Sequence, residues 1–169
     1  MIRAYRPADC EAVLAVWARA SAVAHAFLSP AFLAQERIDI RERYLPNAET
    51  WVWEEGGAVA GFVSLVGSEV GGLFVDPAYQ RRGIGRALIE QARARHGALD
   101  VEVFELNGQG RAFYVALGFV VVARSIHEET GFVLVRMRLE GGEKKWVMVN
   151  GQRSIVNEGG GNPLLMGDC

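Results

Sequence analysis

One stretch in the middle of the chain decides the fold: Leu73-Phe74-Val75-Asp76-Pro77-Ala78-Tyr79-Gln80-Arg81-Arg82-Gly83-Ile84-Gly85-Arg86-Ala87-Leu88-Ile89. Its first part, residues 73–75, is apolar and partly β-branched, which is typical of a strand. Pro77 ends that strand, because proline fixes its own φ and keeps Asp76 out of the helical region. From Ile84 to Ala92 apolar residues recur at four-residue spacing, which indicates one face of a helix. The stretch therefore predicts a strand, a turn and the start of a helix.

The turn of this stretch carries the chemistry of an anion site. Gly83 and Gly85 lie where the helix begins, and Arg81, Arg82 and Arg86 surround them. The first turn of a helix offers unpaired backbone N–H groups and a partial positive charge. Glycine lets an anion approach that backbone without meeting a Cβ atom, and arginine adds charge-assisted donors. The segment therefore predicts a binding site for a phosphate or pyrophosphate.

Two other glycine-rich phosphate motifs do not fit this segment. A P-loop requires Gly-Lys-Ser/Thr after its glycines, whereas Arg86 and Ala87 follow Gly85 here. The dinucleotide fingerprint requires Gly or Ala at its third small position, where this chain has Leu88. The pattern that fits is Gln-x-x-Gly-x-Gly, from Gln80 to Gly85, behind Val-Asp-Pro. It resembles the pyrophosphate-binding signature of the GCN5-related N-acetyltransferases (GNAT), whose ligand is acetyl-coenzyme A (acetyl-CoA).

A second block downstream extends the resemblance. Asn107, then Phe113-Tyr114, then Gly118-Phe119 are similar to the Asn…Phe-Tyr-x-x-x-Gly-Phe block of the same family. The chain departs from the family at Gly110, where the family usually has alanine. Because glycine lowers helix propensity, the first turn of that helix is expected to be looser.

The resemblance implies a mixed α/β fold of the GNAT type. This is a central, mostly antiparallel sheet of about seven strands with flanking helices, in which the fourth and fifth strands are splayed apart. The likeness covers residues 1–139, which we predict to be the acetyltransferase domain. Within the family, His25 followed by Phe27-Leu28 resembles small bacterial acetyltransferases of the YjaB kind.

Periodicity and turn residues predict the remaining elements. A helix begins at Pro7-Ala8-Asp9, with Asp9 as its cap, and Ser29 caps a second helix that has Pro30 at its first position and ends before Pro46. Further helices are predicted over residues 81–95 and 110–117, and strands over residues 2–6, 50–54, 58–66, 69–75, 99–104, 119–125 and 132–139. Gly71-Gly72 inside a strand predicts a bulge or a close approach of another backbone. A bulge would leave backbone groups unpaired, and the amides of the pantetheine arm could bond to them as an added strand does.

The resemblance also implies the reaction and its residues. The reaction is acetyl transfer from acetyl-CoA to a primary amine of a small molecule or peptide, by direct attack in a ternary complex and without a metal. A backbone N–H of Phe74 or Val75 would polarise the thioester carbonyl, and Asn107 would bond the pantetheine or position the helix after it. Tyr114 matches the general acid of the family, and its phenol, with an ordinary pKa of about 10, is protonated at neutral pH. The predicted coenzyme contacts are Phe74, Val75, Gln80, Arg81, Arg82, Gly83, Ile84, Gly85, Arg86, Asn107 and Tyr114.

The sequence does not single out a general base. Glu69, Glu102, Glu105 and His25 are candidates, and a water relay to bulk solvent would also serve. His25 precedes the second helix, where it is a base, a substrate contact or a partly buried histidine of the core.

Composition bounds the class of protein and its partners. The chain has 169 residues, of which 50% are hydrophobic and 22% charged, enough for one domain with a sizeable core. Its net charge of −2 argues against a nucleic-acid surface. Cys10 and Cys169 lie near opposite ends without metal or redox spacing, as in a reducing cytosol. With no signal segment or bilayer-spanning run in the sequence, we expect a cytoplasmic protein without a membrane partner.

Residues 140–169 follow the predicted domain as an extension. Asn150-Gly151 is a two-residue turn signal and predicts a hairpin over residues 146–156, followed by a flexible tail. An appended hairpin, a dimer contact and a mostly disordered extension remain open for this segment, and so does the choice between a monomer and a homodimer.

The sequence leaves two further functions to be weighed. The uncertain base and the extension allow a non-catalytic acyl-CoA-binding sensor or assembly module on the same fold. A nucleotide-binding protein that uses residues 81–86 fits the motif less well, because the pattern from Gln80 to Gly85 matches the acetyltransferase signature.

Overall fold

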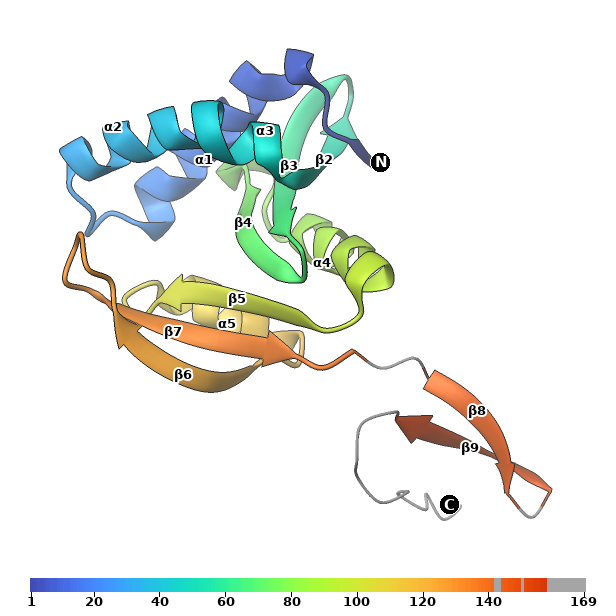
Figure 1. Ribbon diagram of the computed structural model, residues 1–169. Coiled ribbons are helices and arrows are strands. Elements are labelled where there is room, and N and C mark those ends of the chain that lie inside the picture. The colour runs from blue at the N-terminus through green and yellow to red at the C-terminus, as the bar shows by residue number, and fades with distance from the viewer. Residues whose placement is uncertain (142–143, 150, 158–169) are drawn as a thin grey trace.

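A seven-stranded sheet forms the body of the molecule (Figure 1). The computed structural model describes residues 1–141, 144–149 and 151–157. The order of the strands is β1-β2-β3-β4-β5-β7-β6, and every neighbouring pair is antiparallel except the parallel pair β4–β5. The strands are β1 (Ile2–Ala4), β2 (Glu49–Glu55), β3 (Ala58–Val66), β4 (Glu69–Val75), β5 (Leu99–Phe104), β6 (Val120–Ile126) and β7 (Val133–Leu139).

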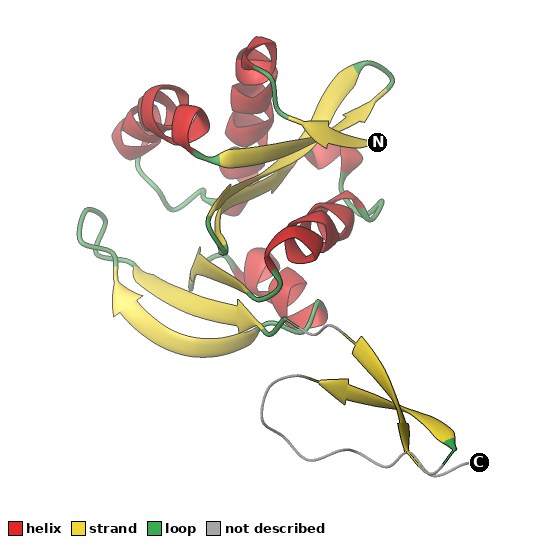
Figure 2. Cartoon of the chain, turned by 45° about the vertical axis from the view of Figure 1, so that its right-hand side comes forward, coloured by secondary structure: helices red, strands yellow, loops and turns green. Residues whose placement is uncertain are grey.

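Helices cover both faces of the sheet (Figure 2). One face packs against α1 (Cys10–Ala24) and the helical run that follows it, and the other packs against α4 (Ile84–His96) and α5 (Gly108–Ala116). The helical run consists of α2 (Pro30–Asp39), the π-helical turn η2 (Ile40–Tyr44) and α3 (Leu45–Asn47), and the short 3₁₀ turns are η1 (Pro7–Asp9) and η3 (Pro77–Tyr79).

The core is divided between the two faces. Val52 and Phe62 pack with Leu14 and Trp17 on the α1 face, while Val63 belongs to the larger cluster under α4 and α5. Because β3 is buried on both of its faces, its sequence is an almost uninterrupted apolar run rather than an alternating one.

The sheet opens between β4 and β5. These two strands pair only at Glu69↔Asp100 and Val70↔Val101, after which they diverge. On the other side of β4 the register with β3 shifts, so that Gly71 is the extra residue of a bulge. The predicted mixed α/β fold with splayed fourth and fifth strands is therefore confirmed, and so is a bulge at the paired glycines.

Three local predictions differ from the structure. The second helical run continues through Pro46 instead of ending before it, with the π-helical turn η2 directly before the proline. Helix α4 begins at Ile84 rather than at residue 81, because Gly83 has a left-handed φ of +80°. Asp9 does not cap α1 with its side chain; its carboxylate instead accepts from the Arg6 backbone N–H at 2.8 Å and pairs with Arg3 at 2.8 Å. Ser29 does cap α2, accepting from Phe32 N–H at 3.1 Å.

The C-terminal extension contains a separate two-stranded sheet. β8 (Lys144–Val149) and β9 (Gln152–Asn157) pair antiparallel where the sequence predicts a hairpin. The predicted flexible tail lies outside the described residues. In the described part of the chain, no helix combines the length and the apolar character that a membrane crossing requires.

Candidate active site

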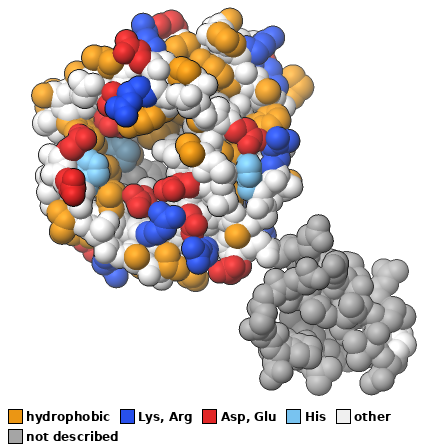
Figure 3. Space-filling model, in the orientation of Figure 1, with side chains coloured by type: hydrophobic (Ala, Val, Ile, Leu, Met, Phe, Trp, Pro, Cys, Tyr) orange, Lys and Arg blue, Asp and Glu red, His pale blue; other side chains and the backbone are white. Residues whose placement is uncertain are grey.

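A cavity of about 840 Å³ occupies the gap between β4 and β5. Its lining reaches from the loop before α4, on one face of the sheet, to α2 and η2 on the other face. Figure 3 shows the hollow open on one side of the molecule, with acidic side chains and histidines beside it. A cavity of this size is large enough for a cofactor-sized ligand and part of a second one.

Asp76 anchors the turn after β4. It is 6% exposed, accepts from Ala78 N–H at 3.0 Å and pairs with Arg19 of α1 at 2.5 Å. The Gln80 amide then donates to the Val75 carbonyl oxygen at 3.1 Å and folds the following segment back onto the strand. These bonds explain why Val-Asp-Pro and the glutamine belong to the motif: they fix the position of the loop.

The loop reaches α4 through two left-handed residues. Arg81 has φ +64°, which is strained for a residue with a Cβ, and Gly83 has φ +80° as the N-cap of α4. A Cβ atom built on Gly83 would meet nothing within 4 Å, so the space above this glycine is open. Free N–H groups of the first turn of α4 and open space together form a cradle for an anion.

The three predicted arginines are not equivalent. Arg81 and Arg86 line the cavity, and Arg86 also pairs with Glu90 at 3.3 Å. The Arg82 side chain lies outside the cavity lining, where it covers the Tyr79 ring at 5.3 Å and approaches Glu55 at 3.9 Å. Arg82 therefore supports the loop from outside, and the cavity offers two guanidinium groups rather than three.

Gly85 is needed for packing as well as for an open first turn. Its ideal Cβ would lie 3.1 Å from two ring carbons of Phe113, closer than side chains normally approach. The absence of a side chain thus lets α4 and α5 approach each other beside the gap, while Ile84 is buried in the core below.

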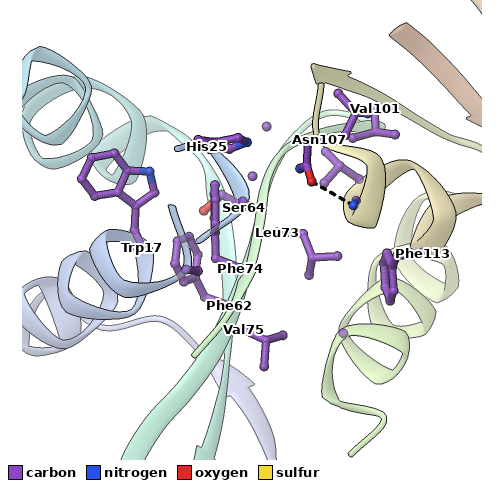
Figure 4. A pocket seen from close by; sticks show the side chains of 18 of the residues that line it. Trp17, His25, Phe62, Ser64, Leu73, Phe74, Val75, Val101, Asn107 and Phe113 are labelled. Atoms are coloured by element: carbon purple, nitrogen blue, oxygen red, sulfur yellow. Dashed lines mark hydrogen bonds between the residues drawn. The ribbon is translucent and has the colours of Figure 1, made fainter. Parts of the chain in front are cut away.

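The open edge of β4 presents specific backbone donors. Asp76 N–H bonds the Ala60 carbonyl of β3 at 2.8 Å. Because bonding directions alternate along a strand, Phe74 N–H also points to β3, whereas the N–H groups of Leu73 and Val75 point into the gap. Of the two predicted donors, Val75 therefore faces the gap and Phe74 does not. In Figure 4 the Phe74 ring lies on the side of His25, and the Val75 side chain lies on the opposite side of the strand.

Asn107 organises the start of α5. It is 9% exposed, and its side-chain oxygen accepts from Gly110 N–H at 2.9 Å (Figure 4). The sequence analysis left two roles open for Asn107, and this bond corresponds to the second, which is to position the helix after it. A Cβ on Gly110 would lie 2.5 Å from the Asn107 amide nitrogen. Glycine at this position thus accommodates the conformation of Asn107, which the comparison with the family motif did not anticipate.

Tyr114 is packed between two aromatic rings and borders the cavity. It is 5% exposed, and its ring centroid lies 5.2 Å from that of Phe113 and 5.1 Å from that of Phe119. Among the described residues, neither a side chain nor a backbone group bonds its hydroxyl. Burial raises the pKa of the Tyr114 phenol well above its ordinary value, so the hydroxyl keeps its proton at every working pH.

His25 lies among aromatic rings from both sides of the gap. Its ring centroid is 6.2 Å from Phe74 of β4 and 5.7 Å from Phe104 of β5, and both contacts are edge-on. Burial lowers the pKa of the His25 imidazole, which favours the neutral form that a base requires. Phe27 continues the aromatic contact to Phe104 at 5.5 Å and to Phe132 at 5.1 Å.

The candidate glutamates fall into two groups. Glu69 and Glu102 line the cavity, but both are held by Arg136 of β7, at 3.4 Å and 3.2 Å. Glu105 is not among the lining residues and approaches Arg124 at 3.7 Å. The ion pairs with Arg136 occupy the carboxylates that the sequence offers as bases, which leaves His25 as the candidate in the cavity without a basic partner among the described residues.

Several residues that line the cavity were not predicted from the sequence, and three of them lie on the side opposite the cradle. Glu36 comes from α2, Tyr44 from η2 and His127 from the segment after β6. His127 meets the Phe104 ring edge-on, with 5.5 Å between the ring centroids, and shares a hydrogen bond with Thr130 at 2.9 Å. The available signal concerned Glu36 alone, which falls at four-residue spacing between Phe32 and Ile40 on one face of the predicted helix.

Comparison with known proteins identifies the family. Residues 46–121 match the acetyltransferase (GNAT) domain. The chain is 37% identical to the peptidyl-lysine N-acetyltransferase YiaC of Escherichia coli over 77% of its length and 90% of that protein. The chain belongs to the GNAT acetyltransferases.

Further relatives agree with this family. The peptidyl-lysine N-acetyltransferase YjaB of Escherichia coli is 35% identical over 77% of the chain and 88% of that protein. The solution structure of its apo form superposes with a TM-score of 0.74 over 82% of this chain and 95% of that one, at 32% identity. YncA of Salmonella typhimurium, solved with acetyl-CoA, shares the fold with a TM-score of 0.58, 23% identity and coverage of 85% and 94%.

These findings confirm the predicted family, fold and activity class. The chain is a GNAT N-acetyltransferase dependent on acetyl-CoA, and a non-catalytic sensor is not favoured. The site fits the coenzyme by its own features: an open anion cradle at Gly83, unpaired strand donors at Val75, and a phenol directed to the cavity. No group of three or more metal-ligating side chains occurs within residues 1–141, 144–149 and 151–157.

Proposed function

We propose that this enzyme acetylates lysine side chains of peptides or proteins. The observation that carries the proposal is the cavity through the gap, which has an anion cradle at one end and carboxylates at the other. YiaC and YjaB are peptidyl-lysine N-acetyltransferases, and an amine that is cationic before reaction suits carboxylates at its entrance.

Each end of the cavity has its own task in this proposal. The first turn of α4, with Arg81 and Arg86, holds the pyrophosphate, while Gln80 and Asn107 position the backbone around it. Acetyl-CoA supplies the acetyl group as a thioester. Val75 N–H in the gap supports the negative charge that develops on the carbonyl oxygen.

Protons are handled by two further residues. Tyr114 donates its phenol proton to the coenzyme A thiolate as the C–S bond breaks, and the phenolate takes a proton back from water in the cavity. Neutral His25, directed into the same cavity, takes the proton from the amine. Because Glu69 is paired with Arg136, it is proposed as a substrate contact rather than as the base.

Calorimetry and mass spectrometry test the two ends separately. Arg86→Ala should weaken acetyl-CoA binding about fivefold, in line with the roughly 1 kcal/mol of one exposed charge-assisted contact. Arg93→Ala, at the far end of the same helix, serves as the control and should leave the Kd unchanged. A peptide with one lysine should gain one acetyl group, whereas the same peptide with norleucine should not. Absence of acetyl-CoA binding at millimolar ligand would refute the proposal.

The catalytic unit and its setting belong to the same proposal. The core clusters draw their residues from the stretch that ends at Leu139, which supports residues 1–139 as the acetyltransferase domain. A chain that ends at Gly141 should keep its activity if this division is right. The net charge of −2 and the free thiol of Cys10 support a cytoplasmic enzyme without a nucleic-acid partner, acting as a monomer or homodimer.

A further inference from the structure

Glu36 is a carboxylate without a basic partner on the wall of the cavity opposite the anion cradle. It projects from α2 and lines the cavity together with Tyr44 and His127. Of the two carboxylates that act on it, Asp39 lies 3.8 Å from Arg43, whereas Glu129 has no ion pair among the described residues. Within the described residues no arginine, lysine or histidine comes within ion-pair distance of Glu36.

The π-helical turn η2 keeps Tyr44 on the same face as Glu36. In an uninterrupted α-helix each residue advances by about 100°, so Tyr44 would be turned about 80° away from Glu36. The extra residue of a π turn reverses that rotation by about 100°, which brings the two side chains to within about 20°. Both residues line the cavity, where the phenol hydroxyl of Tyr44 adds a second acceptor to the carboxylate of Glu36.

The surroundings of Glu36 are negative. Burial, and then the carboxylates of Asp39 and Glu129, raise the pKa of Glu36, while burial and Glu36 raise the pKa of the Tyr44 phenol. A half-buried carboxylate that faces other carboxylates is destabilised in the free enzyme, and a cation bound beside it relieves that cost. A positively charged group would therefore complement this wall of the cavity.

We propose that Glu36, with Tyr44 beside it, binds the protonated acceptor amine at the entrance of the cavity and thereby selects cationic acceptors. This inference rests on the proposed N-acetyl transfer to lysine and adds the residue that recognises the charge. The amine must lose its proton before it attacks, and a carboxylate partner favours the charged form. Glu36 is therefore a recognition residue, and the amine moves on from it towards His25 and Phe74 to react.

The test separates charge recognition from catalysis. Two peptides are compared at one pH: one with a single lysine and one with an aminooxy isostere of that lysine, whose amine is neutral at assay pH. Glu36→Gln should raise the KM of the lysine peptide about tenfold, leave its kcat within about twofold, and change the KM of the aminooxy peptide less than about twofold. Glu42→Gln removes an equal charge from the exposed side of η2 and should change neither KM.

A charge reversal and a binding control complete the design. Glu36→Lys should abolish use of the lysine peptide and retain use of the aminooxy peptide, so it also shows that the variant is folded. The acetyl-CoA Kd should stay constant in all variants, because Glu36 lies opposite the cradle. An equal rise in both KM values, or a fall in kcat with KM unchanged, would overturn the role of Glu36. A wild-type enzyme that binds acetyl-CoA but acetylates only the aminooxy peptide would overturn the cationic acceptor as well, and failure with both peptides would remove the proposed function itself.

Discussion

Replacing Tyr114 by phenylalanine should separate stability from activity. The ring is 5% exposed and held between Phe113 and Phe119, so a phenyl group keeps the packing. Its hydroxyl has no bonding partner among the described residues, and burying a hydroxyl without one costs about 1–3 kcal/mol. Because this hydroxyl borders the cavity, where water reaches it, we take the lower end of that range. Tyr114→Phe should therefore be more stable than the wild type by up to about 1 kcal/mol, which is a rise of roughly 2–4 °C in Tm.

The same substitution should lower turnover sharply. Loss of a general acid costs about 10²-fold or more in kcat, whereas the contacts that hold acetyl-CoA are unchanged. The assay is thiol release from acetyl-CoA at saturating acceptor, with calorimetry for the Kd and thermal unfolding for the Tm. A kcat within threefold of the wild type would refute the acid role. A Tm several degrees below the wild type would refute the argument that the hydroxyl lacks a partner.

Four further substitutions test other parts of the site. Gly85→Ala should lower the free energy of unfolding by about 1–2 kcal/mol, because its Cβ meets Phe113 at 3.1 Å, and adding Phe113→Leu should restore most of that stability. Gly83→Ala should lower the stability by about as much because of its φ of +80°, and thermal unfolding should show that Phe113→Leu does not restore it. Burial lowers the pKa of His25 below 6.5, so below that pH the unfolded chain binds more protons than the folded protein. The wild type should therefore lose more stability than His25→Gln between pH 7 and pH 5. An equal loss of stability in the two proteins would contradict this. Gln80→Ala removes the hydrogen bond to the Val75 carbonyl and should weaken acetyl-CoA binding about fivefold. An unchanged Kd would show that the loop keeps its conformation without this bond.

The parts of the fold that follow from local chain chemistry were predictable. A turn at Gly56-Gly57 requires two positive φ angles, and glycine is the residue that adopts them freely. The bulge at Gly71 and the strand–turn–helix unit around Gly83 likewise depend on backbone conformations that glycine favours, so the glycines in the sequence indicate them. The family resemblance supplied the order of these elements in the sheet, which spacing alone does not give.

The parts that depend on distant contacts were not predictable. Nothing near Gly85 in the sequence reports that Phe113 will lie against it, and nothing near Glu69 reports its pair with Arg136. The π turn was missed for a different reason. Pro46 is a local signal for the end of a helix, and no residue before it signals that the helix widens to a π turn over Ile40–Tyr44, which precedes the proline and holds Tyr44 at the cavity wall.

The short ladder between β4 and β5 has a consequence for the order of events in catalysis. Since only two residue pairs join these strands, the cavity passes from the face of α4 to the face of α2. With the coenzyme on the α4 side and the acceptor on the α2 side, as proposed above, neither ligand covers the part of the cavity that the other occupies. We expect steady-state kinetics of random order, in which free coenzyme A competes with acetyl-CoA but not with the acceptor.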